Sequence, residues 1–317
     1  MTIVRVSLFG KFEVRSGQQI LTGFEAHRVQ ELFCYLLLYR DRPQPREALA
    51  NILWDEEHTD QPGRCLRKTL WQLRSALDSQ SEPLGDRLLQ IEADWVQLDP
   101  NADLWLDVAE FEQAFGQVQH RQGSELDLPG VEAVTDAVGL YRGGLQESWY
   151  QDWYLYEHER FEHMYMVMLD KLMDHCEAQG DYEGGLAHGM RILGCERARE
   201  RTHRRLMRLH YLAGDRTAAL RQYEHCVRAL HEELGVGPAR RTVALHQQIE
   251  MDQLNPSSPS PVEAAKQPPA SPSPLPPALS RLRQLQAVLV DVHRRIGQDI
   301  YALELAINDR DRPVHPE

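Results

Sequence analysis

The chain has 317 residues, of which 42% are hydrophobic and 26% are charged, and its formal net charge is −13. This length predicts two or three domains, and the composition is typical of a soluble globular protein. No apolar run is long enough to cross a membrane, the first residues lack the pattern of a signal peptide, and five scattered cysteines argue against a disulfide framework or a zinc module. We therefore expect a cytoplasmic protein with no membrane partner.

The negative charge is concentrated in one part of the chain. Residues 101–180 have a net charge of −12 (4 basic, 16 acidic), whereas residues 1–100 have −3 (12 basic, 15 acidic) and residues 181–250 have +3 (12 basic, 9 acidic). Exposed charges more than roughly 10 Å apart are largely screened at physiological salt. The acidic total therefore does not exclude a local basic surface that binds nucleic acid.

The N-terminal residues predict a small antiparallel sheet. Residues 3–8 alternate between apolar and polar side chains, and two further short strands, 11–14 and 18–21, are separated by Ser16-Gly17, a two-residue hairpin signal. From Glu25 to Arg40 the apolar residues recur at the helical period, which predicts the first helix.

Two more helices follow before residue 80. Pro45 is expected at the start of the second helix, and the acidic run Asp55–Asp60 separates it from a third helix at Gln61–Leu77. One face of the third helix is apolar because four leucines recur at helical spacing. The opposite face is basic, with four cations and no acid in the whole segment. The four leucines are Leu66, Leu70, Leu73 and Leu77.

Two strand-like runs between Arg87 and Asp99, split by Ala93-Asp94, come directly after the basic helix. Three helices followed by a hairpin is the order of a winged helix-turn-helix, with the hairpin as the wing. This order favours DNA binding over the alternative of a solvated basic face on an ordinary surface helix. The candidate DNA-binding residues are Arg64, Arg67, Lys68, Trp71, Gln72, Arg74, Ser75 and Arg87.

Helical phase assigns a role to most of these side chains. Arg64, Lys68 and Gln72 are expected to meet base edges or phosphates in the major groove. Trp71 is expected to pack against a sugar or a thymine methyl group. The flanking arginines, Arg67 and Arg74, and Arg87 near the wing are expected to contact phosphates.

The sequence predicts helices from Val108 to about Glu250, within a domain at 101–253, and this region contains an internal repeat. Gly180-Asp181 recurs as Gly214-Asp215, 34 residues later, which is the length of a tetratricopeptide unit. A small residue follows in each copy (Gly185 or Ala219) and permits close helix packing. Such an array serves either as a partner-binding surface or as a dimerisation or spacer scaffold, and the sequence favours neither.

An aromatic cluster precedes these repeats and has two interpretations. Its members could surround a small effector, but aromatic residues near a helix start are more often part of the core. We therefore expect core packing. The cluster comprises Trp149, Tyr150, Trp153, Tyr154 and Tyr156.

The last part of the chain changes composition. Residues 254–277 are rich in proline and serine and predict an extended linker. Residues 278–317 predict one amphipathic helix with apolar residues at a 3–4 spacing, interrupted at Asp299. We expect it to form a coiled coil in a homo-oligomer; docking onto the repeats or onto a partner is the alternative. The predicted contact residues are Leu282, Leu285, Leu289, Val292, Ile296 and Leu303.

The sequence contains no recognisable catalytic pattern. The motifs GxxxxGK[ST], GxSxG and HExxH are absent, and no cysteine–histidine cluster has the spacing of metal ligands. We therefore expect neither an enzyme nor a bound cofactor or metal.

Four stretches carry a family pattern: PREALANILWDE at 45–56, LRKTLWQLRSAL at 66–77, YRGGLQESWYQDWYLYEHERF at 141–161, and LMRLHYLAGDRTAALRQYEHCVRALHEELGVGP at 206–238. Over about residues 1–250 the chain resembles the bacterial transcriptional activator domain family, which includes the SARP-type regulators of antibiotic clusters.

The resemblance implies an OmpR-type winged helix followed by a tetratricopeptide-like activator domain. It also implies binding to direct repeats in double-stranded DNA near promoters and help in recruiting RNA polymerase. The recognition helix maps to Gln61–Leu77 and the wing to Arg87–Asp99. Larger members append an ATPase module or a phosphopeptide-binding domain, whereas this chain has only the linker and the terminal helix.

The expected protein is thus mainly α-helical: a winged helix-turn-helix at 1–100, a tetratricopeptide-like domain at 101–253, the linker, and the terminal helix. Its expected function is sequence-specific transcription regulation, with activation favoured. Two alternatives remain open: an adaptor that works through its repeats alone, and a regulator gated by a small effector bound in the repeat domain.

Overall fold

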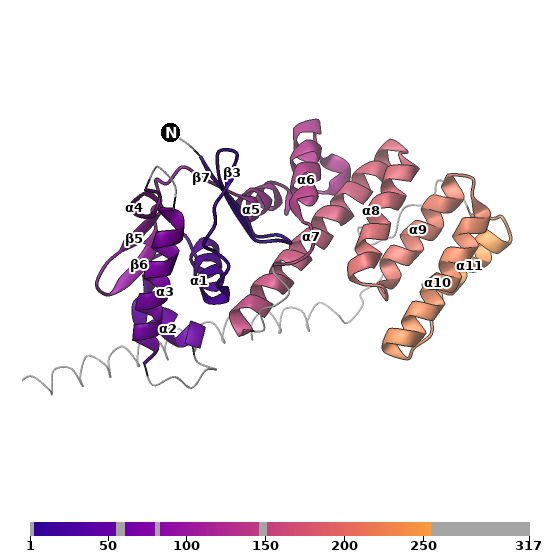
Figure 1. The fold of residues 1–317 in the computed structure, drawn as a ribbon. Helices are drawn as coiled ribbons and strands as arrows, with labels where there is room; N and C mark the ends of the chain where they lie inside the picture. The colour runs from indigo at the N-terminus through magenta and orange to yellow at the C-terminus, as the bar shows by residue number, and fades with distance from the viewer. Residues whose placement is uncertain (1–2, 55–60, 80–82, 146–150, 255–317) are drawn as a thin grey trace, which may run out of the picture. The chain divides into compact units, whose positions relative to one another are not determined.

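The computed structural model describes residues 3–54, 61–79, 83–145 and 151–254. The predicted acidic loop, most of the linker and the terminal helix with its predicted oligomerisation residues therefore lie outside the described residues. Residues up to Leu254 form one compact unit, and their helices and strands are drawn in Figure 1.

The predicted N-terminal sheet is present and gains a strand from farther along the chain. β1 (Val4–Ser7), β2 (Glu13–Ser16) and β3 (Gln19–Ile20) are antiparallel, and β7 (Leu104–Leu106) pairs with β1 in parallel, so that the order is β3-β2-β1-β7. The hairpin turn falls at Gly17-Gln18, one residue later than predicted, with Gly17 at φ 59°. Glycine adopts this positive φ without the strain that a Cβ would introduce.

Three helices follow: α1 (His27–Leu38), α2 (Arg46–Trp54) and α3 (Pro62–Leu77). The second helix begins near Pro45, as predicted, but Pro45 itself lies just before the first turn. Gln44–Pro45 forms β4, which pairs with Trp95 and Val96. A residue before proline is pushed out of the helical region, and proline itself is tolerated on an edge strand, so this dipeptide is extended.

A second sheet lies after α3. The short helix α4 (Gly85–Leu88) leads into β5 (Leu89–Ile91), which forms an antiparallel hairpin with β6 (Trp95–Leu98). With β4 on the other side of β6, the sheet order is β4-β6-β5. The predicted hairpin is therefore confirmed, but it begins at Leu89, and Arg87 belongs to α4 instead of the hairpin.

The region after β7 is helical, as predicted. Its elements are α5 (Asp107–Val118), the 3-10 turn η1 (Gly123–Glu125), α6 (Leu128–Leu140), α7 (Asp152–Gln179), α8 (Tyr182–Cys195), α9 (Glu200–Leu212), α10 (Arg216–Leu234) and α11 (Arg240–Glu250). From α7 to α11 each helix packs against the next, as Figure 1 shows. Among the described helices, none has the length and apolar character needed to cross a membrane.

The repeated Gly-Asp pair has the same geometry in both copies. Gly180 and Gly214 are left-handed residues, with φ 74° and 85°, at the turns that follow α7 and α9. The next residue caps the following helix: the Asp181 carboxylate accepts a hydrogen bond from the amide of Gly184 (3.0 Å), and the Asp215 carboxylate accepts one from Ala218 (2.8 Å). Each pair thus ends one helix and begins the next.

Glycines on α8 permit its close approach to α9. A Cβ on Gly185 would lie 3.0 Å from Leu209 Cδ1, and a Cβ on Gly189 would lie 2.5 Å from Leu206 Cδ2. In the second copy the position of Gly185 is taken by the buried Ala219. Gly189 has Tyr223 as its counterpart, and Tyr223 instead stacks on His246 at a centroid distance of 4.0 Å. The two copies therefore share caps but pack differently.

One hydrophobic core joins the sheets to the helices α5 to α9. The Phe9 ring, just after β1, contacts Phe111 of α5 and Phe161 of α7, with centroid distances of 5.0 and 5.3 Å. The Asp107 carboxylate, at the start of α5, accepts hydrogen bonds from the amides of Leu8 and Phe9 at 2.8–3.0 Å. Burial raises the pKa of Asp107, although these hydrogen bonds act in the opposite direction.

Candidate nucleic-acid interface

The orientation of α3 is fixed by its apolar face. Pro62 occupies the first turn, where its missing amide proton leaves no hydrogen bond unmade. The leucines predicted to face inward are all buried, and α3 packs against α1 and α2 through them. A Cβ on Gly23 would lie 3.0 Å from that of Ala76, so the loop before α1 lies close against the end of α3.

The opposite face of α3 is open to solvent. Arg64, Lys68 and Ser75 are exposed, Gln72 is half-buried, and 69% of Trp71 is accessible. A tryptophan this exposed has no packing role in the unit, and a large apolar ring rimmed by cations is typical of a binding surface. The predicted phase of the helix is therefore confirmed.

The arginines and the lysine on α3 differ in their partners. Within the described residues, Arg64, Arg67 and Lys68 have no ion pair or side-chain hydrogen bond. Arg74 by contrast lies 2.6 Å from a carboxylate oxygen of Asp86 and 3.7 Å from one of Asp78. Three cations are thus available to an incoming anion, whereas Arg74 must first exchange its internal partners.

Arg87 is also placed differently from the sequence expectation. It belongs to α4, and its guanidinium lies 3.7 Å from the Asp103 carboxylate. The structure therefore brings Arg64, Arg67, Lys68 and Trp71 together on α3, and it does not bring Arg87 into that group.

Sequence reasoning missed Arg46, which attaches the hairpin to α2. Its guanidinium donates to the carbonyl oxygen of Glu92 (3.0 Å), and its amide donates to that of Asp94 (2.9 Å). Both acceptors lie at the turn between β5 and β6, so the hairpin is held at the start of α2. The only sequence signal was Gln44-Pro45, which favours an extended segment just before Arg46.

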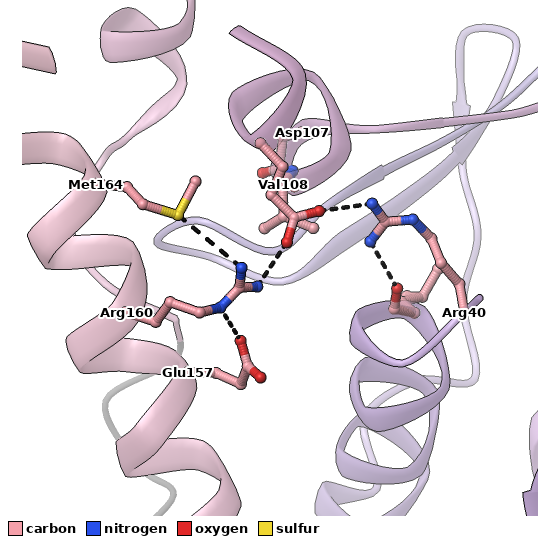
Figure 2. Close-up of polar contacts among 8 residues, drawn as sticks. Arg40, Asp107, Val108, Glu157, Arg160 and Met164 are labelled. Carbon is pink, nitrogen blue, oxygen red and sulfur yellow. Dashed lines mark hydrogen bonds and ion pairs between the residues drawn. The ribbon is translucent and has the colours of Figure 1, made fainter. Parts of the chain in front are cut away.

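A series of ion pairs connects Arg40, at the end of α1, to α7, as Figure 2 shows. One Glu112 oxygen accepts from Arg40 (2.6 Å), and the other accepts from Arg160 (2.5 Å). Arg160 also donates to the buried Glu157 (2.7 Å). Arg40 directly follows α1, whereas Glu112 lies on α5 and Arg160 on α7, so the end of α1 is tied to both helices.

Two of the three described members of the aromatic cluster pack in or against the core. The Trp153 ring meets Tyr35 edge-on at a centroid distance of 5.2 Å, and the buried Tyr154 hydroxyl donates to the carbonyl oxygen of Leu145 (2.5 Å). Core packing is therefore confirmed for these two residues, whereas Tyr156 is exposed. The other two members lie outside the described residues. No group of His, Cys, Asp and Glu in the described ranges could hold a metal ion.

Comparison with known proteins agrees with this architecture. Residues 106–250 match the family model of the bacterial transcriptional activator domain. The chain is similar in fold to EmbR of Mycobacterium tuberculosis, solved in complex with a low-affinity phosphopeptide, with a TM-score of 0.60 and 18% identity over 84% of this chain and 70% of that one. No curated protein matched the sequence.

Residues 106–250 belong to the bacterial transcriptional activator domain family, and the family predicted from the sequence is thereby confirmed.

Proposed function

We propose that the protein is a SARP-type, sequence-specific DNA-binding regulator in which α3 is the recognition helix. The observation that carries this proposal is the face of α3 where, among the residues that the structure describes, Arg64, Arg67 and Lys68 have no side-chain partner beside the exposed Trp71. An α-helix fits the major groove, and free guanidinium and ammonium groups can bind phosphates and guanine edges without breaking an internal ion pair.

The surrounding elements fit a winged helix-turn-helix. The helices α1 to α3 supply the helical part, and the β5–β6 hairpin supplies the wing. Arg46 holds the wing beside α2 and gives it a defined position. In this arrangement Arg64, Lys68 and Gln72 contact bases or phosphates, Trp71 packs on a sugar or thymine methyl group, and Arg67 contacts a phosphate.

The test is a charge reversal on α3. We expect Lys68→Glu to weaken binding of the full chain to its DNA by about 100-fold, because a contact of about 1–3 kcal/mol is lost and a carboxylate then faces the phosphates. The duplex is first identified by in vitro selection with the wild-type chain. Binding is then measured by fluorescence anisotropy at several salt concentrations, with circular dichroism as the test of folding.

Arg241→Glu is the matched control for this experiment. Arg241 is exposed on α11 and makes no ion pair within the described residues, so the same change of charge occurs away from α3. We expect it to retain wild-type affinity. Equal affinities for the wild-type and Lys68→Glu chains would exclude α3 as the recognition helix.

The helices α8 to α11 support a tetratricopeptide-like activator surface, since both copies of the repeat have the same caps. By analogy with its family we propose that this domain helps to recruit RNA polymerase at promoters containing direct repeats. The match to the family model, which covers these helices, supports this proposal.

We further propose that residues 278–317 form a coiled coil between copies of the chain, through the leucine, valine and isoleucine positions predicted above. Removal of these residues is expected to reduce the mass measured by light scattering to that of one chain. The chain with Leu289→Asp and Val292→Asp is a full-length test of the same contact. An unchanged oligomeric state in both variants would assign the segment another use.

A further inference from the structure

A depression of about 230 Å³ lies between α8 and α10, above the first turn of α9. It is separate from α3 and from the aromatic cluster, and it lies within the helices proposed above as the activator surface. The residues that line it and matter here are Met190, Leu193, His203, Gln222, Arg228 and Ala229.

The walls of the depression are apolar. Leu193 and Ala229 are buried, whereas 56% of Met190 is accessible. A methionine side chain adapts its shape to varied apolar partners. Pockets that enclose whole small-molecule ligands typically have volumes of about 300–1,000 Å³. The depression is smaller than this, and its size therefore favours one inserted side chain over an enclosed metabolite.

The floor is polar, but its hydrogen bonds are complete. The Gln222 amide donates to His203 Nδ1 (2.7 Å), which places the imidazole proton on Nε2, where it donates to the carbonyl oxygen of Arg197 (2.8 Å). Burial also lowers the pKa of His203 and keeps the ring neutral. The floor therefore holds α9 against α10 and offers no charge to a ligand.

Two arginines on the rim of the depression, Arg197 and Arg228, differ in their partners. Arg197 is within 3.0 Å of Glu232 and 3.7 Å of Glu233, so its guanidinium is already neutralised. Arg228 is exposed and has no ion pair within the described part of the chain. A free guanidinium beside an apolar opening favours a carboxylate next to an apolar group, because the planar fork binds carboxylates with two hydrogen bonds.

We propose that this depression binds an acidic peptide segment of a partner protein. One apolar side chain of the segment enters between Met190 and Ala229, and a neighbouring aspartate or glutamate pairs with Arg228. Arrays of paired helices present surfaces of this kind to extended chains. This interaction goes beyond DNA recognition by α3 and does not depend on it.

The experiment begins with phage selection of random dodecamer peptides on the full-length chain in the absence of DNA. We expect the recovered peptides to have Asp or Glu within two positions of Leu, Met or Phe. The most frequent one is synthesised with a fluorescein label, and its anisotropy is titrated with wild-type and variant chains. Arg228→Glu should weaken binding about tenfold, since attraction becomes repulsion, and Met190→Gln should weaken it several-fold.

Two further variants separate this site from the basic face of α3. Arg241→Glu, with the same charge change on α11, should leave peptide affinity unchanged. Lys68→Glu should also leave it unchanged, although the same variant tests DNA binding. A peptide that depends on Lys68 but not on Arg228, or a selection that yields basic or uncharged peptides, would overturn the proposal. If Lys68→Glu left DNA binding unchanged, the hypothesis for α3 would fail, but the expected peptide results would stay the same.

Discussion

Asp107→Ala is expected to lower the free energy of unfolding by about 3 kcal/mol or more. The buried Asp107 carboxylate accepts hydrogen bonds from the backbone amides of Leu8 and Phe9 at 2.8–3.0 Å. Without it, two buried amides have no acceptor, and each unpaired group costs about 1–3 kcal/mol. Urea unfolding followed by circular dichroism measures the change. The wild-type and variant midpoints are compared with the same dependence of the unfolding free energy on urea concentration.

Asp103→Ala is the matched control for this prediction. Asp103 is about half-exposed and its carboxylate lies 3.7 Å from Arg87, a distance at which an exposed pair is worth about 0–1 kcal/mol. We expect its loss to change stability by less than about 1 kcal/mol. If Asp107→Ala lowered the free energy of unfolding as little as this control, the amides of Leu8 and Phe9 would have other acceptors. The hydrogen bonds from these amides to Asp107 would then not be what stabilises the contact between the segment after β1 and the start of α5.

The elements predicted correctly from the sequence are those whose signal is local. The leucines of α3 recur at the helical period, and their burial requires no knowledge of the rest of the chain beyond the presence of a core. The same is true of the Gly180-Asp181 and Gly214-Asp215 pairs, because turn geometry and capping involve residues close in sequence.

The elements that were missed depend on distant partners. β7 is three residues long and pairs with β1 from the other end of the N-terminal region, and β4 is a two-residue strand made by its pairing with β6. Such short segments have too few residues for a periodic pattern. Their hydrogen bonds form only after the helices between them have packed.

The chemistry of the candidate site was predictable only in part. Helical phase correctly predicted an exposed face on α3, but it treated Arg67 and Arg74 as equivalent. They differ because α4 brings Asp86 to within 2.6 Å of Arg74, whereas no described carboxylate reaches Arg67. Which cations are available therefore depends on the tertiary placement of a four-residue helix.

The other large effect is expected for Phe161→Ala, which should destabilise the chain by about 3–5 kcal/mol. Phe161 is fully buried on α7, edge-on to Phe9 (5.3 Å) and to Phe111 (6.1 Å), and the guanidinium carbon of Arg160 lies 4.5 Å from its ring centre. Its removal leaves a cavity where three parts of the chain meet. Thermal unfolding measures the change, and Phe115→Ala, at a half-buried position on α5, serves as the milder control.

The same variant tests whether the proposed DNA-binding region and the helices α5 to α11 share one folding unit. The ring of Phe161 and the Arg40–Glu112–Arg160 contacts join α1 and β1 to α7, and the described residues up to Leu254 form one compact unit. On heating, DNA binding and helix content are each lost at a midpoint temperature. We therefore expect Phe161→Ala to lower both midpoint temperatures by the same number of degrees. Separate midpoints would mean that the N-terminal region folds independently of the helices from α5 to α11.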